Sequence, residues 1–122
     1  MINHINKKNR PQIVDITNKN ISMRIAKAEG YVCFEKKIFK QIQEMKTKKG
    51  GIENVAIIAG IIAAKETSRI IPLCHNINLN HVNIEIKKDK KTNSLKISSE
   101  VKTNDKTGVE MEALVAVSVS CL

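Results

Sequence analysis

Two short segments hold most of the side chains that could do chemistry. The first is the stretch IPLCHNINLNHV, in which Cys74 and His75 follow an apolar segment and a proline. Loops on a rigid scaffold commonly present functional side chains, and histidine binds or transfers protons near neutral pH. A loop histidine can equally serve only a backbone hydrogen bond, and a cysteine such as Cys74 is commonly a small buried hydrophobe. The segment is therefore a candidate site, with both interpretations open.

The second segment is KTGVEME, from Lys106 to Glu112. A turn that contains glycine leads into two carboxylates, Glu110 and Glu112, at the start of an expected helix. Acidic residues in a first turn stabilise the helix dipole whether or not they do chemistry. Residues two apart on a helix also point in different directions, so one pocket can hardly use both in the same way. The glutamates are candidate hydrogen-bond acceptors or simply helix-start residues.

Lysines supply the next candidates. Lys48 and Lys49 precede Gly50 and Gly51 in a basic turn that could meet a phosphate. Lys65 ends an apolar helix, where a lysine commonly extends into solvent. The sequence contains neither a Walker loop nor a GxGxxG motif, so these lysines belong to no standard nucleotide-binding loop.

The positions of the other histidines and of the cysteines do not indicate a catalytic or metal-binding site. His4 in the polar N-terminal segment and His81 on the polar face of a strand are interpreted as incidental. Cys33, Cys74 and Cys121 form no CxxC pair, so the pattern predicts neither a disulfide framework nor a structural zinc site. We expect reduced thiols and no metal centre.

The elements that must position these residues follow from the apolar periodicity. We expect a flexible basic arm over residues 1–11 and a single domain over 12–122. The expected elements, in chain order, are an edge strand (12–16), a strand (28–35), a helix (36–45), a mostly buried helix (52–69), an antiparallel hairpin (82–86 and 95–101) and a helix beginning near Val109. This order predicts an α+β fold, a ferredoxin-like split βαβ sandwich with an antiparallel sheet that lacks its C-terminal strand.

Composition narrows the class of partner. The 122-residue chain has a formal charge of +9, which favours anionic partners. However, 18 of its 21 basic residues are lysine, so few arginines are present to recognise base edges. The aromatic content is 2%, which is too low for extensive base stacking. A nucleic-acid binder is therefore a distant alternative. No apolar run approaches the roughly 18 residues that span a bilayer, and we expect a soluble cytoplasmic protein without membrane contact.

Several motifs point to a known family. They are VDI (14–16), Arg24 with AxAxG (26–30), IAGIxAAKxT (58–67), IPLCH (71–75) and TGVEMEAL (107–114). In this order they resemble the cyclic pyranopterin monophosphate synthase family, also known as molybdenum cofactor biosynthesis protein C, from about residue 4 to the last residue. The resemblance implies a ferredoxin-like subunit, a homo-oligomer from dimer to hexamer, and an active site at a subunit interface. It also implies conversion of a cyclised dihydroguanosine triphosphate into cyclic pyranopterin monophosphate with loss of diphosphate.

The resemblance also implies roles for individual residues. Lys49 and Lys65 would bind phosphate or act as general acids, and His75 would bind substrate or transfer protons. Glu110 and Glu112 would hold the guanine-derived ring, since a carboxylate suits its N–H donors. The implied substrate-binding residues are Leu73, Cys74, His75, Arg24, Glu110, Met111 and Glu112. We expect no cofactor, although Mg²⁺ could accompany the triphosphate.

One expectation concerns the C-terminus. The family continues past the position of Leu122 through a Y-D-M-C-K stretch, whose aspartate and lysine are counted among its catalytic residues, to a last strand. General acid–base groups typically contribute about 10² to 10⁴ in rate, so this chain could retain little activity. The explanations left open are a truncated product, an incomplete gene model and completion by another polypeptide. The alternative function is a non-catalytic homologue that keeps the fold and the nucleotide pocket as a binding or interaction subunit.

Overall fold

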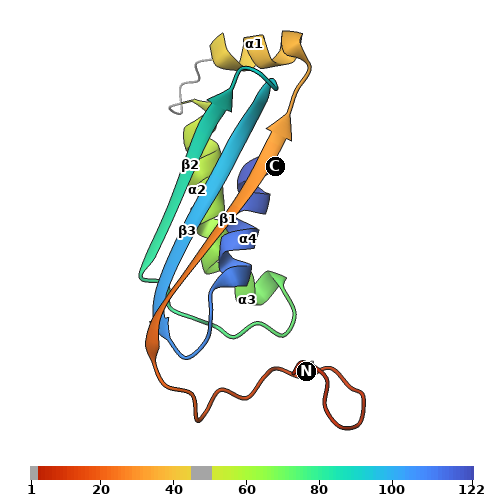
Figure 1. The fold of residues 1–122 in the computed structure, drawn as a ribbon, viewed down its shortest axis with the longest axis vertical. Coiled ribbons are helices and arrows are strands. Elements are labelled where there is room, and N and C mark those ends of the chain that lie inside the picture. Colours follow the sequence, from red (N-terminus) through yellow and green to blue (C-terminus); the bar gives the residue numbers. More distant parts are fainter. Residues whose placement is uncertain (1–2, 45–50) are drawn as a thin grey trace.

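A long antiparallel sheet backed by helices forms the body of the protein (Figure 1). The computed structural model describes residues 3–44 and 51–122. Within these ranges the elements are β1 (Ser22–Cys33), α1 (Lys36–Glu44), α2 (Ile52–Lys65), α3 (Thr67–Ile70), β2 (His81–Asp89), β3 (Ser94–Asp105) and α4 (Glu110–Cys121). The predicted α+β class with an antiparallel sheet is confirmed.

The sheet has the order β1-β3-β2, with β3 in the centre. Val101 of β3 pairs with Ala26 of β1 on one side and with Val82 of β2 on the other. Alternate residues of β3 are buried, as expected for a strand with one face against a core. The predicted hairpin is confirmed, and its turn uses Asn93 with a φ of 51°, a left-handed conformation that asparagine tolerates well.

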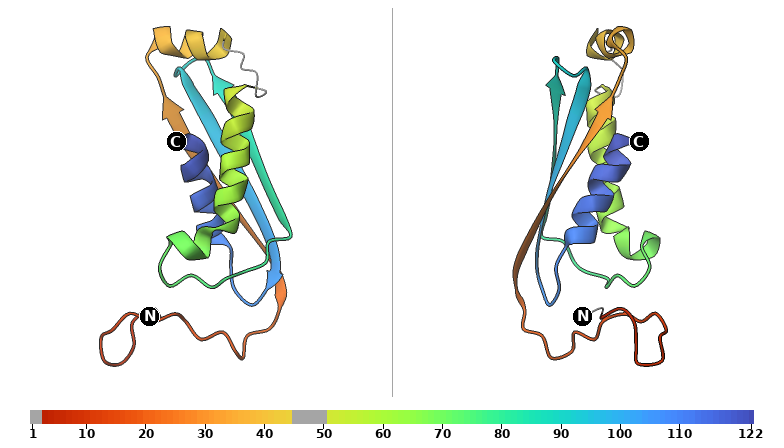
Figure 2. Two further views of the ribbon diagram at one scale, coloured as in Figure 1. Left: turned by 180° about the vertical axis from the view of Figure 1, so that it is seen from behind. Right: turned by 45° about the vertical axis from the view of Figure 1, so that its right-hand side comes forward.

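Helices α2 and α4 lie side by side on one face of the sheet, and α1 lies across the end of the strands (Figure 2). The main core cluster joins both helices to the sheet through Ala64, Ile84, Ile97, Ala116 and Val117. The opposite face of the sheet carries the outward-pointing residues of all three strands. The site described below lies at the end of the body away from α1.

The two helices approach closely at Gly60 of α2. A Cβ at this position would overlap the Ser120 hydroxyl and would lie 2.9 Å from the Ala116 carbonyl oxygen. The Ser120 hydroxyl donates a hydrogen bond to the Ala56 carbonyl, 2.9 Å away, which joins α4 to α2. Glycine in a helix ordinarily costs stability, so its presence here reflects the space between the helices.

Three expectations about the elements are wrong. Residues 12–16 form no strand. β1 begins at Ser22 instead of residue 28, because its inward positions are small or polar and lack the apolar alternation that marks a strand. The helix expected over 52–69 divides at Glu66 into α2 and α3, where the Thr67 hydroxyl bonds the carbonyls of Ala63 and Ala64 and competes with the regular helix pattern.

The other two helix predictions hold. The expected helix over 36–45 corresponds to α1, and Met45 lies outside the described residues. The helix expected near Val109 is α4, with Val109 as its N-cap.

The N-terminal segment runs beneath the lower end of the body (Figure 2). Residues 4–12 form a loop in which Asn6 Oδ1 accepts hydrogen bonds from the backbone N–H groups of Lys8 and Arg10. Ile5 and Pro11 form an isolated bridge across this loop. The flexibility expected for residues 1–11 stays a prediction. Among the described helices, none is long and apolar enough to cross a membrane.

We expect Gly60→Ala to destabilise the protein by about 1–3 kcal/mol, because the added methyl group overlaps α4. Alanine favours helix over glycine by about 0.5–1 kcal/mol, so a measured loss must come from packing. Chemical denaturation gives the free energy of unfolding, with Ile58→Val at an exposed position of α2 as the control. A variant as stable as the wild type would show that the two helices do not pack this closely.

Candidate functional site

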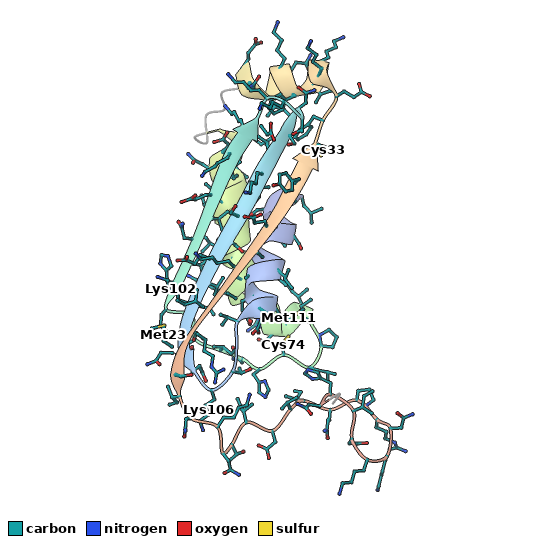
Figure 3. All side chains as sticks on the ribbon, in the orientation of Figure 1. Met23, Cys33, Cys74, Lys102, Lys106 and Met111 are labelled. Carbon is teal, nitrogen blue, oxygen red and sulfur yellow. The ribbon has the colours of Figure 1, made fainter. Side chains whose placement is uncertain are left out.

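A pocket of about 130 Å³ lies at the base of the body, where the loop after α3 meets the start of α4. Six of the residues implied by the family resemblance line it together: Leu73, Cys74, His75, Glu110, Met111 and Glu112. Four further lining residues were not predicted: His4, Ile77, Thr107 and Gly108. In Figure 3, Cys74 and Met111 lie close together at this end of the body. The two chemistry-bearing segments of the sequence thus form one site.

The central strand positions both walls of the pocket. Val101 of β3 packs against Val109 and Ala113 at the start of α4. The Ser99 hydroxyl donates a hydrogen bond to the Ala113 carbonyl at 2.8 Å. The Thr103 hydroxyl donates to the Asn78 carbonyl at 2.6 Å and so holds the loop after α3.

The two glutamates have different environments. Glu112 is 5% exposed, whereas Glu110 is exposed. Burial raises the pKa of the Glu112 carboxyl, and the charge of Glu110 adds to the increase, while the backbone N–H of Glu112 opposes it. Both side chains line one pocket but lie in different environments there, as expected for residues two apart on a helix, and the raised pKa means that Glu112 holds a proton more readily than an ordinary carboxyl. The pair can therefore act as one acceptor and one proton-exchanging group.

Gly108 lies in the turn before α4, directly under the carboxylate of Glu110. A Cβ there would overlap the carboxylate oxygens of Glu110, which folds back over the turn. Glycine at this position leaves room for the Glu110 carboxylate at the pocket rim. The sequence motif placed Thr107 and Gly108 beside the glutamates, but nothing in their types marked them as lining residues.

Cys74 is half-buried, and both its burial and the Glu112 carboxylate raise the pKa of its thiol. The protonated thiol is a poor nucleophile and a poor metal ligand. The interpretation of Cys74 as a small packing residue therefore fits its surroundings. Among the described residues, no group of three His, Cys, Asp or Glu side chains is arranged to hold a metal ion.

His75 contacts the N-terminal segment. Its Nε2 lies 2.6 Å from the carbonyl oxygen of Val14. Because a carbonyl oxygen only accepts, Nε2 must carry the hydrogen in this contact. In the neutral ring, Nδ1 is then the atom left to accept a proton or a hydrogen bond. The bond to backbone that the sequence offered as an alternative is present, and it leaves one ring nitrogen for chemistry.

The basic candidates do not join the pocket lining. Lys65 is exposed at the end of α2, and Lys49 lies outside the described residues. Arg24 reaches the turn before α4, where its Nη2 is 3.4 Å from the Lys106 carbonyl oxygen. Its Nε is buried without a partner among the described residues. Within the described lining of the pocket there is no lysine or arginine.

We expect Glu112→Gln to raise the melting temperature at pH 7.5 and to change it much less near pH 4. The raised pKa means that the folded protein binds the Glu112 proton more readily than the unfolded chain does. The contribution of Glu112 to stability is thus present at low pH and is lost as the pH rises through its raised pKa. Glutamine carries no charge and avoids this loss.

Thermal unfolding from pH 4 to pH 8 measures the effect, with Glu85→Gln on the exposed face of β2 as the matched control. A difference between wild type and Glu112→Gln that is independent of pH would contradict the expected burial of a charged group.

Comparison with known proteins places the chain among related sequences. The MoaC family model matches residues 13–122. A protein of Helicobacter pylori (strain Shi470) named cyclic pyranopterin monophosphate synthase is 47% identical over 121 residues, which are 99% of this chain and 77% of that protein. Proteins with the same name from Syntrophomonas wolfei and Staphylococcus epidermidis are 47% and 45% identical, each over 98% of this chain and over 76% and 75% of their own lengths.

Proposed function

This chain belongs to the MoaC family, and from that premise we propose that it catalyses the cyclic pyranopterin monophosphate synthase reaction of molybdenum cofactor biosynthesis. The substrate is (8S)-3',8-cyclo-7,8-dihydroguanosine 5'-triphosphate, and the products are cyclic pyranopterin monophosphate and diphosphate. The observation that carries the proposal is the pocket in which Glu110 and Glu112 face the loop of Cys74 and His75. Its relatives carry the name of this synthase.

The pocket suits the ring portion of such a substrate. A guanine-derived ring presents amino and ring N–H donors, and carboxylate oxygens accept from both. A hydrogen bond to Glu112 is strengthened by its burial, because a low local dielectric screens it less than water does. Glu112, with its raised pKa, and Nδ1 of His75 are the groups we propose for proton transfer during ring rearrangement.

The triphosphate requires cations that the described pocket lining does not supply. Arg24 lies next to the turn before α4, and we propose it as one phosphate contact. Lys49 lies outside the described residues, and the family resemblance implies an active site at a subunit interface. We therefore propose that the site is completed at an interface between copies, in which Lys49 of one copy serves the pocket of another. Lys65 stays a further candidate for phosphate binding.

The proposed conditions follow from the same chemistry. We propose no bound cofactor, with Mg²⁺ only as a companion of the triphosphate. A cytoplasmic location suits the free cysteines Cys33, Cys74 and Cys121, since a reducing compartment keeps thiols free. The alternative of a non-catalytic homologue is not favoured, because relatives at 45–47% identity are named as synthases. The loss of activity expected from the C-terminal segment finds no support in these comparisons.

Turnover tests the proposal directly. We expect the purified 122-residue protein to release diphosphate from the cyclised dihydroguanosine triphosphate. His75→Ala should lower kcat/KM by about 10² or more, because it removes a group proposed for proton transfer. His81→Ala, on the exposed face of β2, is the matched histidine control and should leave the rate unchanged. No release by the wild type, or an unchanged rate for His75→Ala, would count against the proposal.

Mixed subunits test the shared site. We expect His75→Ala and Lys49→Ala proteins to be nearly inactive alone and to regain activity when unfolded together and refolded as a mixture. For a dimer with two shared sites, random mixing restores up to about a quarter of the wild-type rate. Diphosphate release measures the recovery. If the mixture stays inactive although mixed oligomers form, then each site is built within one copy.

A further inference from the structure

The N-terminal segment brings a second histidine to the pocket. His4 lines the same cavity as His75 and Glu110, although 71 positions separate the two histidines in the sequence. Nothing in the residue pattern around His4 marks it, and the proposed reaction above gives it no role. Its ring has no hydrogen-bond partner among the described residues, so both of its nitrogens are available to a bound molecule.

A short series of contacts fixes this segment against the pocket. The carbonyl of Val14 bonds to His75 Nε2 at 2.6 Å. Two residues earlier, the backbone N–H of Gln12 donates to the His4 carbonyl at 2.8 Å. The Lys106 ammonium donates to the Thr17 carbonyl at 3.3 Å, on the far side of Val14. The N-terminal segment (residues 3–21) runs beneath the lower end of the body (Figure 2), and these contacts link His4 to His75 in the pocket lining. We call this segment the strap.

The pocket requires a hydrogen-bond donor for the carbonyl oxygen of the substrate ring, and His4 can supply one. Two carboxylates and a protonated thiol dominate the described polar lining, and carboxylates serve the N–H donors of a guanine-derived ring. The same ring has a carbonyl oxygen, which requires a donor. His75 already uses its Nε2 hydrogen on Val14, so an N–H of His4 is the remaining imidazole donor in the described lining.

On the basis of the proposed synthase function, we propose that His4 is a further substrate-contacting residue, delivered by the N-terminal strap and donating a hydrogen bond to the ring portion of the substrate. It acts on binding, while Glu112 and His75 act on the chemistry. The strap is held to the body by few hydrogen bonds and its residues are mostly exposed, so we expect a bound substrate that contacts His4 to hold it more firmly.

Steady-state kinetics of the full chain test the contact. His4→Ala should raise KM about tenfold with kcat changed by less than about threefold, as expected for the loss of one hydrogen bond in binding. His4→Gln keeps an N–H donor and should restore KM to within about threefold of the wild type. Lys8→Ala, an exposed position on the same loop, is the control and should match the wild type. Equal KM values for His4→Ala and wild type, or equal losses for alanine and glutamine, would overturn the proposal.

Limited proteolysis supplies a second measurement that does not depend on turnover. Trypsin can cut the strap after Lys7, Lys8 or Lys19, all of which are exposed. Substrate should slow these cuts in the wild type, and much less in His4→Ala at the same substrate concentration. Equal protection in both proteins would overturn the role of His4. If the wild type neither binds nor converts the substrate, it is the proposed function that fails, whereas an active wild type with an indifferent His4 refutes this inference alone.

Discussion

The candidate site depends on the way the central strand β3 is buried. Val101 is completely buried, and Val109, which begins the turn into α4, packs against it with 1% exposure. Ser99 and Thr103 flank Val101 on the same face of the strand. The Ser99 hydroxyl donates to a carbonyl of α4, and the Thr103 hydroxyl donates to a carbonyl of the loop after α3. Since an unsatisfied buried hydroxyl is costly, these bonds fix both pocket walls to one strand.

This rigid wall accounts for the contrast between the two glutamates. The first turn of α4 is drawn towards the sheet by Val109 and Ala113, and Glu112 is carried into the protein with it. Glu110 faces outward on the same turn and folds over Gly108 instead. One helix start therefore provides a solvated carboxylate and a desolvated one. Burial is the main cause of the raised pKa of Glu112, and the charge of Glu110 adds to it.

The sequence predicted those parts of the fold and site that depend on local pattern. The hairpin of β2 and β3 and the start of α4 follow from alternating or helical apolar residues near recognisable turns. β1 was predicted to begin at residue 28 because the inward residues of its first half, Arg24 and Ala26, are polar or small and lack the apolar alternation that marks a strand. His4 was missed because docking of the N-terminal strap depends on contacts of His75 and Lys106 with backbone carbonyls, which residue types do not record.

The pocket thus combines one wall of high stability with one of low stability. The wall built on β3 and α4 belongs to the core, whereas the strap is held by contacts to His75 and Lys106 and buries little of its own surface. A carboxylate that transfers protons is best placed on the stable wall of β3 and α4, because small displacements of a reacting group weaken catalysis strongly. A residue that contacts the substrate only while it is bound is best placed on the strap, which can move to let substrate enter and product leave. The roles proposed for Glu112 in proton transfer and for His4 in substrate binding follow this division, and His75, bonded to the strap through Nε2, is the residue through which the two walls meet.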